Sequence, residues 1–215
     1  MLYHILDTET AGLKGGVCEL AFLIVDKDFN IQQEFCELLN PEVPIHEQAT
    51  AIHGIKDSDV VGKPTLGEIA AVHFKEPINI IGHNIRFDIR MTKDHVRVAE
   101  ELCTLALART YIKGTTNHKL ETLQTELGLP VQKSHSALGD VHTCRDLLLY
   151  MRDKFEISIE QELAKSKVPK LVHKMPFGKH KGKGLLQLPA DYRAWLLNQE
   201  IDKDLRFSLE QLKGM

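Results

Sequence analysis

The sequence contains no apolar stretch long enough to cross a membrane. Its longest uninterrupted run of apolar residues, Leu20 to Val25, has six members, whereas a membrane-spanning helix needs about 20. The first residues also lack a basic segment followed by an apolar one, so no signal peptide is indicated. We therefore expect a cytoplasmic protein without a membrane partner.

Cysteine is also scarce, and the chain has no overall excess of positive charge. The four cysteines, at positions 18, 36, 103 and 144, form no Cys-x-x-Cys motif. This pattern indicates reduced structural thiols rather than disulfides or a zinc site. The net charge of −3 argues against binding nucleic acid through bulk charge. Residues 163–190 are an exception, with seven lysines and no acid. They form either a solvated linker or a surface that contacts phosphates.

The order of the expected elements indicates an α/β fold with a mixed sheet flanked by helices. At 215 residues, the chain has room for one domain and a small appendage. Residues 2–9, 17–26 and 29–39 read as three strands joined by short turns, which predicts an antiparallel meander. Strand and helix patterns then alternate. Strands are expected at 78–83 and 101–104, and helices at 105–111, 119–127 and 137–155.

Two carboxylates end the first expected strand, in Asp7-Thr8-Glu9. Because side chains alternate along a strand, Asp7 and Glu9 should leave the same face. Like charges at that distance repel each other and raise each other's pKa, whereas a divalent cation such as Mg²⁺ or Mn²⁺ would bind both. A solvated strand end is the alternative, because about one Asp-x-Glu is expected by chance in a chain of this length.

Two further motifs supply acids and a histidine. In Asn84-Ile85-Arg86-Phe87-Asp88, Asn84 is a candidate N-cap and Asp88 lies one turn into the helix that follows. In the second motif, His135 precedes Asp140 by five residues. We expect Asp140 in the first turn of the long amphipathic helix and His135 on the loop before it.

The three motifs together resemble the DEDDh class of DnaQ-like 3′–5′ exonucleases, over residues 2 to about 152. That family carries Asp-x-Glu, Asn-x-x-Phe-Asp and His-x-x-x-x-Asp in this order. The resemblance implies an RNase H-like fold with a five-stranded mixed sheet. Gly12-Leu13-x-Gly15-Gly16 and Phe177-Gly178-Lys179 are further similar to the bacterial exonuclease X branch. The implied organisation is an exonuclease domain at 1–155, a helix and linker at 156–174, and a C-terminal module of exonuclease X type at 175–215.

The resemblance also implies a chemistry. Asp7, Glu9, Asp88 and Asp140 would hold two Mg²⁺ ions per site, for which Mn²⁺ can substitute, with Asp7 as the bridging ligand. His135 would act as general base toward the attacking water. The reaction would release nucleoside 5′-monophosphates from DNA 3′ ends, single-stranded or duplex, with a place in DNA repair.

The same resemblance suggests which residues contact the substrate. Leu13 would pack on the 3′-terminal base, and Lys14 would contact a phosphate. His53 either lines the nucleotide site or is structural. The full set of expected substrate contacts is Thr8, Thr10, Gly12, Leu13, Lys14, His53, Asn84 and Phe87.

Three alternatives remain open from the sequence. An exoribonuclease of RNase T or oligoribonuclease type would use the same acids. The aromatic content of 6% disfavours the multi-ring stacking site that we associate with such an enzyme. A non-catalytic accessory subunit is disfavoured by five intact positions. Finally, the basic C-terminal segment could be the functional part. The sequence also leaves a homodimer open.

Overall fold

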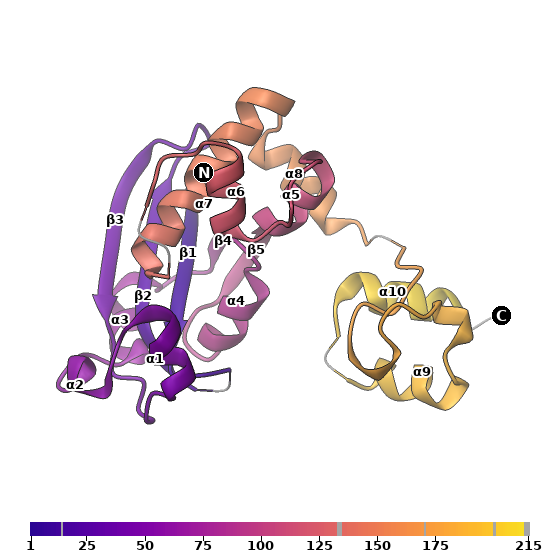
Figure 1. Ribbon diagram of the computed structural model, residues 1–215, viewed down its shortest axis with the longest axis horizontal. Helices are drawn as coiled ribbons and strands as arrows, with labels where there is room; N and C mark the ends of the chain where they lie inside the picture. The colour runs from indigo at the N-terminus through magenta and orange to yellow at the C-terminus, as the bar shows by residue number, and fades with distance from the viewer. Residues whose placement is uncertain (14, 133–134, 170, 200, 213–215) are drawn as a thin grey trace. The chain divides into compact units, whose positions relative to one another are not determined.

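The computed structural model describes residues 1–13, 15–132, 135–169, 171–199 and 201–212 of the chain. By their internal contacts, these residues form two compact units, Met1–Leu163 and Ala164–Met215. Each unit is described by itself. Figure 1 labels the strands and helices of the larger unit.

The larger unit is built on a mixed sheet with the strand order β3-β2-β1-β4-β5. The strands are β1 (Tyr3–Thr10), β2 (Val17–Val25), β3 (Ile31–Leu38), β4 (Ile78–Gly82) and β5 (Val98–Cys103). β1 pairs antiparallel with β2 and parallel with β4. The predicted α/β fold with a five-stranded mixed sheet is therefore confirmed, and its central strand carries Asp7 and Glu9.

Helices cover both faces of this sheet. The elements are α1 (Glu47–His53), α2 (Asp57–Val60), α3 (Leu66–His73), α4 (Arg86–Thr92), α5 (Thr104–Tyr111), α6 (Leu120–Glu126), α7 (Ala137–Phe155) and α8 (Ile159–Lys167). Ile5 packs in one core with apolar residues of α5 to α8. Its neighbour Leu6 packs in a second core with residues of α3. Because β1 is buried on both faces, polar side chains in it need partners.

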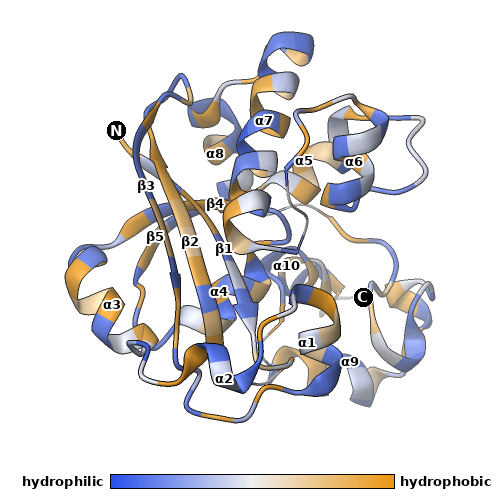
Figure 2. Ribbon diagram, turned by 60° about the vertical axis from the view of Figure 1, so that its left-hand side comes forward, coloured by the Kyte–Doolittle hydropathy of each residue, from blue (hydrophilic) through white to orange (hydrophobic). Residues whose placement is uncertain are grey.

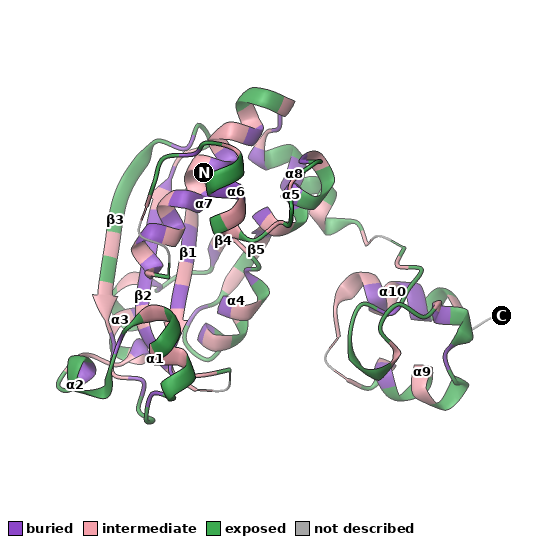
Figure 3. Cartoon of the chain, viewed as in Figure 1, coloured by how far each residue is buried: buried purple, intermediate pink, exposed green. Residues whose placement is uncertain are grey.

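The strands differ in how deeply they are buried. β2 is apolar on both sides and appears orange in Figure 2. The edge strand β3 is largely exposed, as Figure 3 shows. This difference explains why the sequence pattern of β2 is a continuous apolar run broken only by Glu19.

Several expected elements are confirmed at their predicted positions. α7 spans Ala137–Phe155 as expected, with the Ser136 side chain accepting a hydrogen bond from the Gly139 amide. The Thr65-x-x-Glu68 pattern of the sequence, which is typical of a helix start, forms the capping box of α3. β5 begins three residues earlier than expected, at Val98.

The smaller unit has its own core of six buried residues. They come from α9 (Ala190–Leu197), α10 (Lys203–Gln211) and the turns before them, and are Met175, Leu185, Leu188, Leu196, Leu205 and Leu209. As the only tryptophan of the sequence, Trp195 would be expected to anchor this core, and that expectation is wrong. Trp195 is 52% exposed, because the adjacent Leu196 occupies the inward face of α9. Within the parts of the chain that the structure describes, no helix is both long and apolar enough to span a bilayer.

Candidate active site

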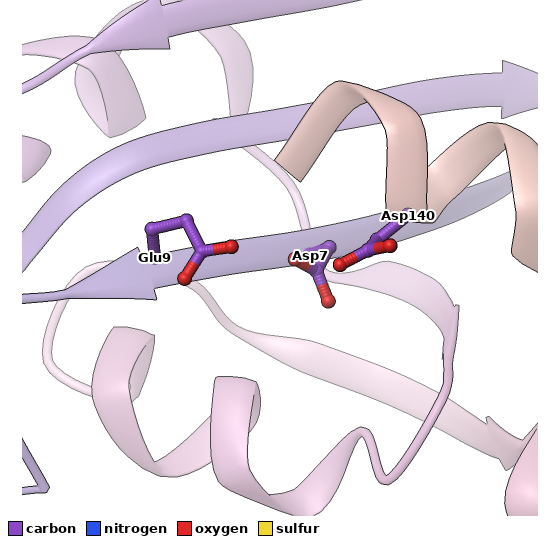
Figure 4. Close-up of side chains that lie close together, drawn as sticks. All are labelled: Asp7, Glu9 and Asp140. Carbon is purple, nitrogen blue, oxygen red and sulfur yellow. The ribbon is translucent and has the colours of Figure 1, made fainter. Parts of the chain in front are cut away.

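Three carboxylates from two distant segments meet at the end of the central strand. Asp7 and Glu9 lie on β1, and Asp140 is the fourth residue of α7. One oxygen from each carboxylate lies within 4.8 Å of the others. Figure 4 shows the three side chains converging. The convergence follows from packing, because α7 lies against β1 and β2.

The environment of these acids disfavours their charged forms. Burial raises the pKa of Asp7 well above its usual value, and repulsion from Asp88, Asp140 and Glu9 adds to the shift. Burial, followed by repulsion from Asp140, raises the pKa of Glu9 to about 7. Burial also raises the pKa of Asp140 to about 6. Partly buried carboxylates this close together form a donor set that fits a hard divalent cation, whose charge would stabilise their ionised forms.

Asp88 is held at the same strand by two hydrogen bonds. It lies on α4, is 3% exposed, and its Oδ1 accepts hydrogen bonds from the Thr8 amide (3.0 Å) and the Thr8 hydroxyl (2.7 Å). Burial raises the pKa of Asp88 to about 7, although the bonds from Thr8 oppose the shift. The negative charge of Asp88 raises the pKa of Asp7, so Asp88 is electrostatically coupled to the cluster.

The expected capping role of Asn84 is wrong. α4 begins at Arg86, its N-cap residue is Ile85, and no side chain caps the helix. Asn84 instead has a positive φ of 65°, in the left-handed region that asparagine tolerates better than most residues. It turns the chain between β4 and α4 and so determines where Asp88 lies.

His135 precedes α7 and lies beside Asp140, as expected. Its charge and a hydrogen bond from its backbone amide both lower the pKa of Asp140, against the effect of burial. The imidazole itself is half exposed, and its Nε2 lies 3.4 Å from Oε2 of Glu121. In this conformation the ring pairs with Glu121 on α6.

A cleft of about 700 Å³ opens next to Glu9. Its lining consists of Thr8, Glu9, Thr10, Gly12, Leu13, His46, Gln48, Ala49, Ile52, His53 and Phe87. Six of the eight expected substrate contacts are in this set. Asn84 lines a different cavity, with His83 and Arg109. Lys14 lies outside the described residues.

Two residues that line the cleft have exposed apolar side chains. Leu13 is 81% exposed and Ile52 is 60% exposed. Leu13 is therefore a surface residue, as required for packing on a base, although a leucine could equally have belonged to the core. Ile52 was not among the contacts predicted from the sequence, although it directly precedes His53, which was.

His53 lines the cleft and also forms hydrogen bonds that hold its two sides together. Its Nδ1 accepts a hydrogen bond from the Ile55 amide (3.0 Å), so the ring hydrogen must lie on Nε2, which faces the Thr10 carbonyl oxygen at 3.3 Å. Burial lowers the pKa of His53. The neutral ring thus links the end of β1 to the end of α1.

Glu19 is a further acid at the site that the sequence analysis missed. It lies opposite Glu9 in the β1–β2 pairing. Its Oε2 accepts the Ala137 amide hydrogen at 2.8 Å, which satisfies one of the unpaired N–H groups at the start of α7. Glu19 thereby ties β2 to the helix that carries Asp140. The signal was visible in the sequence as the single charged residue in the apolar run from Val17 to Val25.

The comparisons with known proteins agree with this geometry. An exonuclease family model matches residues 4–148. A second model, named after a quorum-sensing-regulated virulence factor, matches residues 164–203. Exodeoxyribonuclease 10 of Escherichia coli K12 is 30% identical over 97% of both chains.

Solved structures give the same result. A structure of exonuclease X in complex with 5′ overhanging duplex DNA matches with a TM-score of 0.65 and 30% identity, covering 75% of this chain and 98% of that one. Exonuclease I of Escherichia coli, in complex with a dT13 oligonucleotide, shares the fold with a TM-score of 0.63 at 19% identity. That match covers 72% of this chain and 42% of that one. The chain therefore belongs to the exonuclease family and is a 3′–5′ exonuclease.

Proposed function

We propose that this protein hydrolyses the 3′-terminal phosphodiester bonds of DNA and releases nucleoside 5′-monophosphates. The observation that carries the proposal is the cluster of Asp7, Glu9 and Asp140, with Asp88 beside it. DNA is proposed as the substrate because the similar Escherichia coli protein is an exodeoxyribonuclease and the similar solved structure contains DNA.

The four acids would hold two Mg²⁺ ions, with Asp7 as the shared ligand. Such a pair supplies charge stabilisation for both the attacking and the leaving oxygen of a phosphoryl displacement. Thr8 holds Oδ1 of Asp88 and so orients this carboxylate before any substrate binds. Glu19 performs the equivalent task for Asp140 by fixing the start of α7.

His135 is proposed as the base that takes the proton from the attacking water. A neutral imidazole can accept a proton on one ring nitrogen, which suits this role. The ring would turn from Glu121 toward Asp140, to which the backbone amide of His135 already donates a hydrogen bond. Glu121 could then hold the ring in its resting position between reactions.

The cleft is proposed to receive the 3′-terminal nucleotide. Leu13 and Ile52 offer exposed apolar surface for a base, and Glu9 at the edge of the cleft joins it to the acid cluster. We further propose that residues 1–155 carry the catalysis, with 156–174 as a helix and linker and 175–215 as a separate module. The cytoplasm is the proposed location, where the four thiols, none of them in a disulfide, would stay reduced.

The test compares Asp7→Ala with the exposed Asp94→Ala as a matched control on 3′-end-labelled DNA and RNA, each single-stranded and duplex, with Mg²⁺. We expect the native protein and Asp94→Ala to release labelled mononucleotides from DNA, and Asp7→Ala to release none while circular dichroism shows an intact fold. Substantial activity of Asp7→Ala would refute the metal assignment. Preferred degradation of RNA would refute the substrate.

A further inference from the structure

Two aromatic rings stack on the surface of the C-terminal unit. Tyr192 and Trp195 are three residues apart and therefore share one face of α9. Their ring centroids are 5.5 Å apart and their planes differ by 26°. Trp195 is the only tryptophan of the chain, and it is half exposed. Because core packing is provided by Leu196, the exposed indole needs another explanation.

Cationic and polar groups extend this row of rings. The His180 ring lies 4.6 Å from the Tyr192 ring, edge to face, and Lys179 Nζ lies 5.3 Å from its centroid. Lys181 and Lys183 follow on the same turn and are exposed. Residues 174–198 contain five lysines and arginines but only one acid, Asp191.

The turn that carries these lysines is held by its backbone. The Met175 amide donates a hydrogen bond to the Lys183 carbonyl oxygen at 2.8 Å. The Gly182 amide donates one to the Met175 carbonyl oxygen, also at 2.8 Å. Gly178 and Gly182 have φ values of 68° and 84°, which glycine adopts without strain. Met175 itself is buried in the small core. The cations are therefore presented on a structured turn.

One polar atom in the row has no partner within the described residues. His180 Nδ1 is buried from solvent and forms no hydrogen bond there. A buried, unpaired ring nitrogen costs free energy unless a ligand satisfies it. Because this atom is closed to solvent, the His180 ring contributes to the row through its edge-to-face packing on Tyr192 rather than through Nδ1.

We propose that Trp195, Tyr192, His180 and Lys179 form a binding site for single-stranded DNA on the C-terminal unit, separate from the catalytic cluster. Bases of a single strand have free faces that stack on aromatic rings, and lysines track the phosphates between them. A duplex hides those faces within its own stack. The choice of DNA over RNA rests on the proposed function. An acidic protein would engage the lysines without covering the indole, and so fits fewer of these groups.

The single tryptophan allows a direct test with the full-length protein in EDTA, where no hydrolysis is expected. A 20-residue oligothymidylate is titrated while tryptophan fluorescence and the anisotropy of the labelled oligonucleotide are recorded together. We expect quenching that follows binding, and much weaker quenching with an abasic oligomer of equal charge. Trp195→Ala should weaken binding about 5- to 150-fold, as expected for the loss of one stacked base. Trp195→Phe should restore most of it, and Lys179→Gln should reduce the salt dependence.

Leu186→Ala serves as the matched control, since Leu186 is an exposed apolar residue of the same unit. The proposal is overturned if anisotropy saturates without quenching, or if Trp195→Ala binds as tightly as Leu186→Ala. It is also overturned if polyglutamate quenches Trp195 and the oligonucleotide does not. Quenching in a protein that leaves DNA intact once Mg²⁺ is added would refute only the proposed hydrolysis. Hydrolysis without quenching would refute only this site.

Discussion

Replacing Glu9 with glutamine should stabilise the metal-free protein while removing its activity. Glutamine keeps the size of the side chain but cannot ionise. In the folded protein, burial and then the charges of Asp140 and Glu19 raise the pKa of Glu9 from 4.5 to about 7. Below pH 4.5 this carboxyl group is protonated in both the folded and the unfolded protein, so it does not affect the free energy of unfolding. The destabilisation grows as pH rises toward 7 and is constant above it.

The size of the effect follows from that shift. One pKa unit corresponds to about 1.36 kcal/mol, so a shift of about 2.5 units sets an upper bound of about 3.4 kcal/mol. Because the Glu9 carboxylate is partly exposed, solvent screening reduces the expected value to about 2 kcal/mol. We therefore expect Glu9→Gln to be about 2 kcal/mol more stable than the native protein at pH 8 in EDTA, and nearly equal to it at pH 4.

Urea denaturation followed by far-UV circular dichroism is the suitable assay. Guanidinium would screen the repulsion under study, because it is a salt. Tryptophan fluorescence would report on the wrong unit, since Trp195 lies in the smaller one. Saturating Mg²⁺ should reverse the order, as binding at 100 times the Kd stabilises the native protein by about 2.7 kcal/mol. Equal urea midpoints at pH 8 in EDTA would refute the reasoning, with the exposed Glu76→Gln as the control.

Three other substitutions test single contacts. Glu19→Ala should cost about 1.5–3 kcal/mol of stability by leaving the Ala137 amide without its charged acceptor, and it should weaken Mg²⁺ affinity in a calorimetric titration. Glu19→Gln retains an acceptor and should restore both. His135→Ala should lower kcat about 10²- to 10⁴-fold with Mg²⁺ affinity kept, and an unaltered pH–rate profile would argue against its role as base. Leu13→Ala should slow digestion of duplex ends more than of single strands, because the exposed side chain would no longer hold the terminal base away from its partner. Equal losses on both substrates would contradict that role.

The sequence was most informative where one local rule decides the outcome. Strand alternation placed Asp7 and Glu9 on one face, and helical periodicity gave α7 with its correct ends. The convergence of Asp140 with them was predicted only through the resemblance. No local pattern determines how α7 lies across the sheet, because this depends on packing between distant segments.

The errors have physical causes of the same kind. Asn84 is a good N-cap by propensity, but the turn out of β4 requires a left-handed residue and uses asparagine for that purpose. Trp195 has the hydrophobicity of a core residue, yet a single step of about 100° around α9 separates it from the inward position of Leu196. Glu19 was overlooked because its partner is a backbone amide 118 residues away.

The junction between β1 and β4 gives the central strand an unusual edge. The two strands pair at His4 with Ile80 and at Ile5 with Ile81. Farther along the same edge, the hydrogen of the Thr8 amide goes to the Asp88 side chain instead of to a neighbouring strand. Exchange of this hydrogen with solvent therefore requires only a local movement of one carboxylate, whereas exchange of a β1 amide that is bonded to a neighbouring strand requires those two strands to separate. Amide hydrogen exchange at Thr8 would thus report how often Asp88 leaves its resting position, in a protein whose sheet remains closed.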